Sequence, residues 1–162
     1  MKTFEFDYTL PDGMIAQTPI EPRHNSRLLL LDRSKPDHQH KKFFEIGEFL
    51  NKDDLLVINR TKVIPARIYA RKDTGGKVEV LLLRQVENGI WECLVGGKRI
   101  NAGKNLHIEN GPDIRIIKDL DGSKRLIQFT EAVEPYLDHI GQMPLPPYIH
   151  TNLKNTGRYQ TV

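Results

Sequence analysis

The apolar positions of residues 1–64 occur in short continuous runs, LLLL at 28–31 and LLVI at 55–58. Such runs are typical of strands that are buried on both faces. Between the runs, apolar residues recur at helical spacing: Phe43, Ile46, Phe49 and Leu50. This spacing predicts a short amphipathic helix over residues 42–51. Two buried strands joined through a helix indicate an α/β layer, in which parallel pairing is one possible arrangement.

The pattern changes after Pro65, where short strand-like segments alternate with hairpin signals. Those signals are Asn88-Gly89, Asn110-Gly111 and Asp121-Gly122. The segments around them favour strands: residues 66–86, 90–95, 106–108, 114–117 and 126–129. We therefore expect antiparallel β structure over residues 66–130 that closes into a small barrel or a curled sheet.

A short helix is expected next. Thr130 is a suitable N-cap residue, and Gly141 is a suitable end. Val133, Leu137 and Ile140 would form the apolar face of this helix.

Residues 141–149, GQMPLPPYI, contain three prolines in four positions. Proline fixes φ and removes a backbone donor, so residues 144–147 must be extended and stiff. Tyr148 then places an aromatic ring on a pre-ordered backbone. Taken alone, the segment could be a rigid connector, a ligand for a proline-binding domain, or part of a site.

These elements give an α+β fold class, with part of an α/β domain and an inserted small antiparallel β-barrel. Residues 1–64 and 151–162 would be incomplete portions of the larger α/β domain. Residues 65–150 would be the inserted barrel, with its C-terminal helix and proline-rich return. Because the last residues read as the start of a new element, we expect a truncated chain.

Composition sets broad limits on the 162-residue chain. Its net charge of +3 and pI near 9.0 permit an anionic partner without demanding one. It contains no run of about 18 apolar residues, so we expect no membrane segment. The single cysteine, Cys93, excludes an internal disulfide and fits a reducing cytoplasm.

Candidate ligand contacts lie in two polar segments. Four polar residues follow the run at 55–58: Asn59, Thr61, Lys62 and Arg67. The planar guanidinium of Arg67 suits a carboxylate or a phosphate. Arg23 and Arg27 flank the segment RHNSR and could also bind phosphate. The alternatives are an Asx-turn with surface cations at the first segment and an acid partner for Arg27 at the second.

Other potential motifs carry little chemistry. Gly75-Gly76-Lys77 lacks the spacing of a phosphate-binding loop and indicates a tight turn. His38 and His40 have no neighbours in metal-ligand spacing, so we expect no metal. The sequence shows no Ser-His-Asp or Cys-His arrangement, and the catalytic residue remains unknown at this point.

Several long segments resemble one enzyme family in the family's order. They are FDYTLPDGMIAQTPIEPR at 6–23, SRLLLLDR at 26–33, DDLLVINRTKVIPARI at 53–68, GGKVEVLLL at 75–83, GQMPLPPYI at 141–149 and RYQTV at 158–162. Through these segments the chain resembles the N-terminal half of the S-adenosylmethionine:tRNA ribosyltransferase-isomerases of queuosine biosynthesis. Arg60 departs from the family's usual Asp or Asn.

The resemblance implies transfer of the ribosyl part of S-adenosylmethionine to 7-aminomethyl-7-deazaguanine at the wobble position of tRNA. The sugar is isomerised, epoxyqueuosine forms, and adenine and methionine are released. The resemblance also implies an α/β domain with an inserted barrel, no metal, and a monomer at full length. Tyr148 or Tyr159 could stack a base of the anticodon loop. Four cations could bind RNA phosphate or the methionine carboxylate: Arg23, Arg27, Lys62 and Arg67.

Two other classes stay open. A stand-alone, non-catalytic RNA-binding β-barrel predicts Lys and Arg clustered on the barrel. An interaction module presenting its prolines predicts that residues 144–147 are exposed. If the chain is half of an enzyme, we expect it to be catalytically silent alone, because a site between two halves is not preorganised by one of them.

Overall fold

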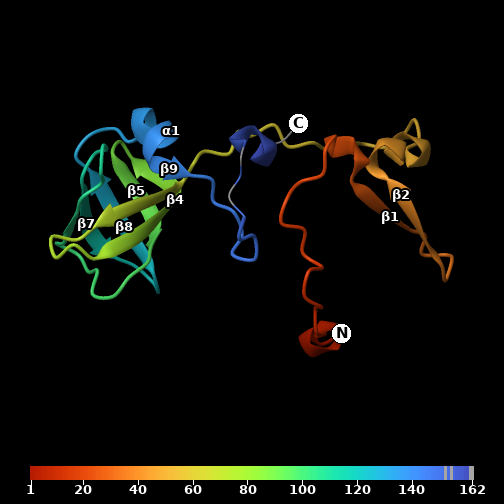
Figure 1. The fold of residues 1–162 in the computed structure, drawn as a ribbon, viewed down its shortest axis with the longest axis horizontal. Coiled ribbons are helices and arrows are strands. Elements are labelled where there is room, and N and C mark those ends of the chain that lie inside the picture. The colour runs from red at the N-terminus through yellow and green to blue at the C-terminus, as the bar shows by residue number, and fades with distance from the viewer. Residues whose placement is uncertain (152, 154, 161–162) are drawn as a thin grey trace. The chain divides into compact units, whose positions relative to one another are not determined.

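A computed structural model describes residues 1–151, 153 and 155–160 of the chain. It divides into two compact units, and Figure 1 labels several of their elements. Unit 1 contains Met1–Arg60 and the described residues of Pro146–Arg158. Unit 2 contains Thr61–Leu145 with Tyr159 and Gln160. That residues 65–150 are an insertion in a larger domain stays a prediction.

Unit 1 contains one small sheet and short 3-10 helices. Strands β1 (Arg27–Leu31) and β2 (His38–Lys42) pair antiparallel, with Leu29 opposite His40. The 3-10 helices that begin in this unit are η1 (Thr3–Phe6), η2 (Arg23–Asn25), η3 (Phe43–Phe49) and η5 (Thr156–Tyr159). The chain folds into β1 and β2 around a polar turn in which Asp32 accepts hydrogen bonds from Ser34.

The predicted burial of residues 28–31 on both faces is wrong. Leu29 and Leu31 are 52% and 70% exposed, because no described segment of unit 1 covers the face of β1 on which they lie. Residues 55–58 form no strand, and the least exposed of them, Leu56, is still 63% exposed. The parallel pairing that was one possible arrangement of these two runs is therefore absent from the described residues.

The helix expected over residues 42–51 is the 3-10 helix η3. The carboxylate of Glu45 accepts a hydrogen bond from the backbone N–H of Lys42 at 2.6 Å, which fixes the start of the helix. Gly47 and three phenylalanines within seven residues disfavour an α-helix, and this composition accounts for the tighter form.

Unit 2 is a curled antiparallel sheet. Its strands are β3 (Arg67–Arg71), β4 (Lys77–Glu87), β5 (Ile90–Val95), β6 (Asn105–Leu106), β7 (Ile114–Asp119), β8 (Lys124–Phe129) and β9 (Gly141–Gln142). They pair in the order β6-β7-β8-β5-β4-β3-β9, and every pair is antiparallel. The antiparallel structure predicted for residues 66–130 is thus confirmed.

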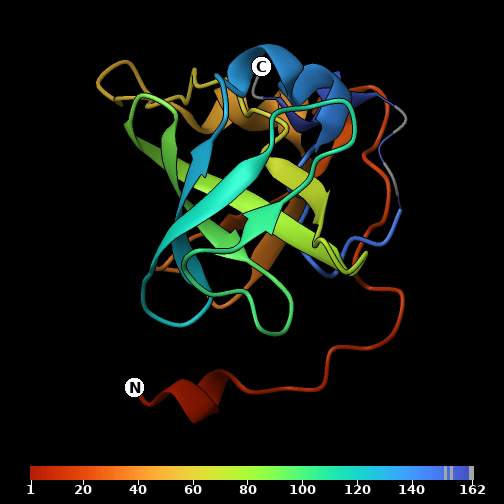
Figure 2. The same cartoon turned by 90° about the vertical axis from the view of Figure 1, so that its left-hand side faces the viewer.

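The sheet is strongly curled, as Figure 2 shows, and the segment after β6 reaches β3. Arg71 at the end of β3 and His107 after β6 form an antiparallel bridge with N···O distances of 2.8 and 2.7 Å. Register shifts in β4 between Leu82 and Arg84 add local twist. Two of the predicted hairpin turns use a left-handed glycine, Gly89 at φ +73° and Gly122 at φ +58°.

The hydrophobic core lies inside unit 2. All the buried apolar side chains fall between Ala66 and Leu137, and Ile68, Val80, Ile116 and Ile127 have no exposed surface. The strands alternate buried and exposed positions, as β3 does from Ile68 to Ala70. No described residue of unit 1 is buried. Only unit 2 therefore has a closed core of its own.

The helix expected from Thr130 begins later, as η4 (Glu134–Tyr136) followed by α1 (Leu137–Ile140). Pro135 occupies the first helical turn, where its missing N–H costs nothing. The predicted apolar face is confirmed, since Val133 and Leu137 are buried and Ile140 packs against the core. Among the described residues, no helix is long and apolar enough to cross a membrane.

Candidate functional site

Arg23 lies in unit 1 at a cavity of about 570 Å³. Pro19 and Pro22 prevent a long helix here, so only the three residues of η2 are helical, and of these Arg23 and His24 are exposed. The cavity is lined by Glu21, Arg23, His24, Ser26, Phe43 and Arg158. It therefore combines two guanidinium groups with one carboxylate, an imidazole, a hydroxyl and an aromatic ring.

Arg158 is the most enclosed charge in this cavity, with 18% of its side chain exposed. Its Nη2 donates to the carbonyl oxygen of Ile20 at 2.6 Å and lies 3.1 Å from Oε2 of Glu21. Arg23 Nη2 in turn donates to the carbonyl oxygen of Arg158 at 3.5 Å. The lining thus holds two guanidinium groups and one carboxylate, and guanidinium donors suit a carboxylate or phosphate ligand.

Two further cavities of unit 1 adjoin the first through shared residues. A cavity of about 310 Å³ is also lined by Glu21 and Arg158, and Gln17 lies on its wall. Gln17 also lines a cavity of about 450 Å³, together with Tyr148 and His150. We call these three cavities, which are linked through shared lining residues, the cavity row; Arg23 lines the first of them and Tyr148 the last.

Gln17 holds the segment that carries Tyr148. Its Nε2 donates to the carbonyl oxygen of Tyr148 at 3.0 Å, and its Oε1 accepts from the backbone N–H of His150 at 2.8 Å. A turn with Ile149 N–H donating to the Pro146 carbonyl at 3.0 Å tightens the same segment. Only the backbone of Tyr148 takes part in these bonds, so its half-exposed ring is available to a ligand.

A second glutamine, Gln160, holds a backbone segment of unit 2 through both ends of its side-chain amide. The Gln160 side chain accepts from the Val63 N–H at 2.8 Å and donates to the Val63 carbonyl at 2.7 Å. Next to it, the hydroxyl of Tyr159 donates to the carbonyl oxygen of Pro144 at 3.3 Å. The structure thus uses the hydroxyl of Tyr159 to fix the start of the proline run.

Arg67 lies in β3 of unit 2 and is three-quarters buried. Its Nε is 3.0 Å from Oε1 of Glu79, an ion pair whose angle does not make a hydrogen bond. Its Nη2 donates to the carbonyl oxygen of Leu145 at 3.3 Å. Arg67 therefore connects two strands of the sheet to the proline run within this unit.

The remaining predicted residues are spread over both units. Arg27 is exposed at the start of β1, opposite Lys42. Asn59, Thr61 and Lys62 are exposed in an extended segment. Of the eight candidates, Arg23 and Tyr148 line cavities of the cavity row, and they line different ones.

The sequence reasoning missed the three residues that link the ends of this row: Gln17, Glu21 and Arg158. The available signal was that Gln17 and Glu21 lie in the segment at 6–23 and Arg158 in the segment at 158–162, both of which carry the family resemblance. The described residues contain no group of three or more His, Cys, Asp or Glu side chains arranged to hold a metal ion.

Comparison with known proteins gives consistent matches. A family model described as queuosine biosynthesis protein matches residues 3–162. The chain is 47% identical over 167 residues to a Clostridioides difficile protein named S-adenosylmethionine:tRNA ribosyltransferase-isomerase, covering 100% of this chain and 49% of that protein. A Fusobacterium nucleatum protein of the same name is 44% identical over 165 residues, covering 98% of this chain and 46% of that protein.

A solved structure is also similar, that of S-adenosylmethionine tRNA ribosyltransferase from Thermotoga maritima. Its identity is 40% and its TM-score is 0.43, covering 85% of this chain and 48% of that chain. The chain spans about half the length of the curated relatives it matches.

Proposed function

The chain belongs to the family of queuosine biosynthesis proteins, and on this premise we propose that it is part of a tRNA ribosyltransferase-isomerase. In this proposal the ribosyl moiety of S-adenosylmethionine is transferred to 7-aminomethyl-7-deazaguanine at the wobble position of the tRNA anticodon loop. The sugar is isomerised to give epoxyqueuosine, and adenine and methionine leave. The names of relatives that match the whole chain support this reaction.

The observation that supports the proposal is the cavity row, whose linings include two arginines and Tyr148. Arg23 and Arg158 are suited to the methionine carboxylate or to an RNA phosphate. Tyr148 is suited to stack an adenine or a splayed-out RNA base, a contact worth about 1–3 kcal/mol per base. Arg27, Asn59, Thr61, Lys62, Arg67 and Tyr159 are further candidates for substrate contacts.

The residues of this chain would act by binding and orienting the two substrates. The nucleophile is the aminomethyl group of the RNA base, so the protein needs to hold that amine against the ribose and accept its proton. The cavity row offers Glu21 and His24 beside the two arginines. We assign neither of them as the base.

We further propose that unit 1 is completed by the remainder of a full-length family member, in which it is part of a larger α/β domain. The support is physical: residues 55–58 and one face of β1 expose large apolar side chains, and no described residue of unit 1 is buried. Exposed apolar surface of this extent favours burial by a partner segment. The full-length protein would act in the cytoplasm as a monomer, without a metal.

A chimera tests the function. The chain is fused to the second half of the C. difficile relative, and adenine release is measured with S-adenosylmethionine and tRNA that carries the 7-aminomethyl base. The chimera should release adenine only when both substrates are present, and the 162-residue chain alone should release none. A folded chimera that releases no adenine would contradict the proposed activity, and turnover by the chain alone would contradict its dependence on a second half.

A non-catalytic RNA-binding barrel is the second candidate, favoured by the closed core of unit 2. It predicts that the chain binds tRNA and that the folded chimera still releases no adenine. The chimera assay therefore separates the two candidates.

A further inference from the structure

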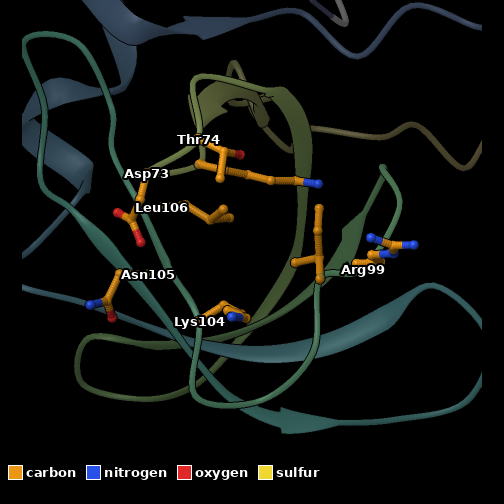
Figure 3. A pocket seen from close by; sticks show the side chains of 8 residues that line it. Asp73, Thr74, Arg99, Lys104, Asn105 and Leu106 are labelled. Atoms are coloured by element: carbon orange, nitrogen blue, oxygen red, sulfur yellow. The ribbon is translucent and has the colours of Figure 1, made fainter.

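Unit 2 has a cavity of about 330 Å³ that lies outside the cavity row. Figure 3 shows it from close by, with side chains from separate loops arranged around Leu106. The turn between β3 and β4 contributes Lys72 and Asp73, and the loop between β5 and β6 contributes Arg99 and Lys104. Ile100 and Leu106 form an apolar floor. We call this cavity the barrel pocket.

The charge of the barrel pocket is positive. Three cationic side chains, Lys72, Arg99 and Lys104, line it with a single carboxylate, that of Asp73. Oδ1 of Asp73 lies 2.8 Å from Nε2 of His107, so this carboxylate already has a partner outside the lining residues. An anion entering the pocket would therefore meet uncompensated positive charge.

We propose that the barrel pocket binds phosphate groups of the tRNA backbone and thereby orients the RNA, an inference that rests on tRNA being the substrate in the proposed function. Lys and Arg are the side chains that most often neutralise RNA phosphates. None of the described residues that line the pocket is aromatic, so base stacking does not supply the contact. We therefore expect the pocket to contact the RNA backbone, whatever the base sequence of the RNA.

The loop that carries Lys104 is fixed before any ligand arrives. Gly103 N–H donates to the Ile116 carbonyl at 2.8 Å, and Ile116 N–H donates to the Lys104 carbonyl at 2.9 Å. Oδ1 of Asp119 accepts from the Ala102 N–H at 3.1 Å. A loop that is already ordered loses little entropy on binding, which favours affinity.

Arg99 is held in an unusual backbone conformation, with φ at +58°. Arginine rarely adopts this region of φ, and such backbone conformations are common at functional sites. The neighbouring backbone is anchored on both sides: Arg125 Nε donates to the Ile100 carbonyl at 3.1 Å, and Lys72 Nζ donates to the Lys98 carbonyl at 2.5 Å. These two contacts therefore hold the stretch of backbone from which the Arg99 side chain emerges.

The test measures binding of unmodified tRNA to the chain by fluorescence anisotropy, over a series of salt concentrations and without turnover. The variant Arg99→Ala/Lys104→Ala removes two cations of the pocket. The matched control Arg84→Ala/Lys118→Ala removes two exposed cations outside it, and Glu92, the partner of Arg84, keeps Lys124 at 3.3 Å. A charge-preserving variant, Arg99→Lys/Lys104→Arg, keeps both positive charges in place.

We expect the pocket variant to bind tRNA about tenfold more weakly and to reduce the slope of log K against log salt by about two. The control and the charge-preserving variants should bind within about twofold of wild type. Equal binding by the pocket variant and the wild type would overturn the pocket assignment and leave the proposed function intact. If the wild-type chain binds no tRNA at low salt, the result contradicts the inference and also counts against tRNA as the substrate. The adenine-release assay of the chimera then tests the proposed function separately.

Discussion

Gly141 lies directly against the carbonyl oxygen of Pro65, at the place where the chain enters and leaves the curled sheet of unit 2. A Cβ at position 141 would overlap that oxygen and would lie 2.6 Å from the carbonyl oxygen of Leu137. Both obstacles are backbone atoms, so neither can rotate away. The close approach lets Gly141 pair with Ile68 at the edge of β3 and direct the proline run.

We therefore predict that Gly141→Ala destabilises unit 2 by about 2–4 kcal/mol, measured as the free energy of unfolding in urea. Gly76→Ala is the matched control, because a Cβ there would make only ordinary contact with Lys72 at 3.7 Å. The control should lower the free energy of unfolding by less than about 0.5 kcal/mol. Equal free energies of unfolding for the two variants would show that the backbone at Pro65 moves at little cost to admit the new Cβ.

The thiol of Cys93 should be unreactive in the folded chain. Burial raises the pKa of its thiol to about 12, and the residue has no exposed surface. The thiolate is the reactive form, so a disulfide reagent at pH 8 should label the native chain slowly and the urea-unfolded chain at once. A Ser123→Cys/Cys93→Ala variant, with its thiol in an exposed turn, is the positive control. Rapid labelling of native Cys93 would mean that the core opens frequently.

His107 should make the stability of unit 2 depend on pH. Hydrogen bonds to Asp73 and then to Asp113 raise the pKa of His107 above its ordinary value of 6.5. Because the folded pKa is the higher one, the stabilisation is fully present below about pH 6.5 and is lost as pH rises through the folded pKa.

The Tm difference between wild type and His107→Gln should therefore be largest near pH 6 and should shrink toward pH 9. Asp73→Asn/Asp113→Asn should remove most of the same pH dependence, since it removes both partners of the imidazole. A Tm difference that is constant with pH would show that the contacts of His107 do not depend on its charge.

Tyr148→Ala, made in the chimera, should weaken substrate binding and leave stability unchanged. The ring is 52% exposed in the cavity row, and its backbone bond to Gln17 survives the substitution. Loss of one stacked base corresponds to about 1–3 kcal/mol in kcat/KM, or roughly 5- to 150-fold. Tyr148→Phe keeps the ring and should retain most activity.

Arg67→Ala offers a contrast to Tyr148→Ala. Because Arg67 contacts Glu79 and the Leu145 carbonyl within unit 2, its loss should lower Tm as well as kcat/KM. If Tyr148→Ala also lowers Tm in proportion to activity, Tyr148 is structural and the proline run is a connector.

The curled sheet was predictable because its signals are local. Asn88-Gly89 and Asp121-Gly122 specify tight turns by their own backbone preferences, and alternation along β3 and β4 specifies the buried face. The runs at 28–31 and 55–58 were misinterpreted because burial on both faces depends on what other segments cover them. A continuous apolar run predicts that its side chains are buried, but it does not identify the segment that buries them.

The site was partly predictable for the same reason. Arg23 and Tyr148 stand out as polar and aromatic groups next to prolines, so local reasoning names them as candidates, and both line cavities of unit 1. The contacts of Gln17 with Tyr148 and of Arg158 with Ile20 join residues 131 and 138 positions apart, and no local pattern encodes such distances. Long-range hydrogen bonds of this kind are visible only once the chain is folded.

The central claim, that this chain forms part of an enzyme that moves the ribosyl group of S-adenosylmethionine onto tRNA, is tested most directly by following that group. The chimera is incubated with S-adenosylmethionine labelled with a heavy isotope in its ribose and with tRNA carrying the 7-aminomethyl base, and the nucleosides of the digested tRNA are analysed by mass spectrometry. We predict that the label appears in one modified nucleoside at the wobble position. Unlabelled tRNA after incubation with a folded chimera, under conditions in which the parent C. difficile enzyme transfers the label, would contradict the claim.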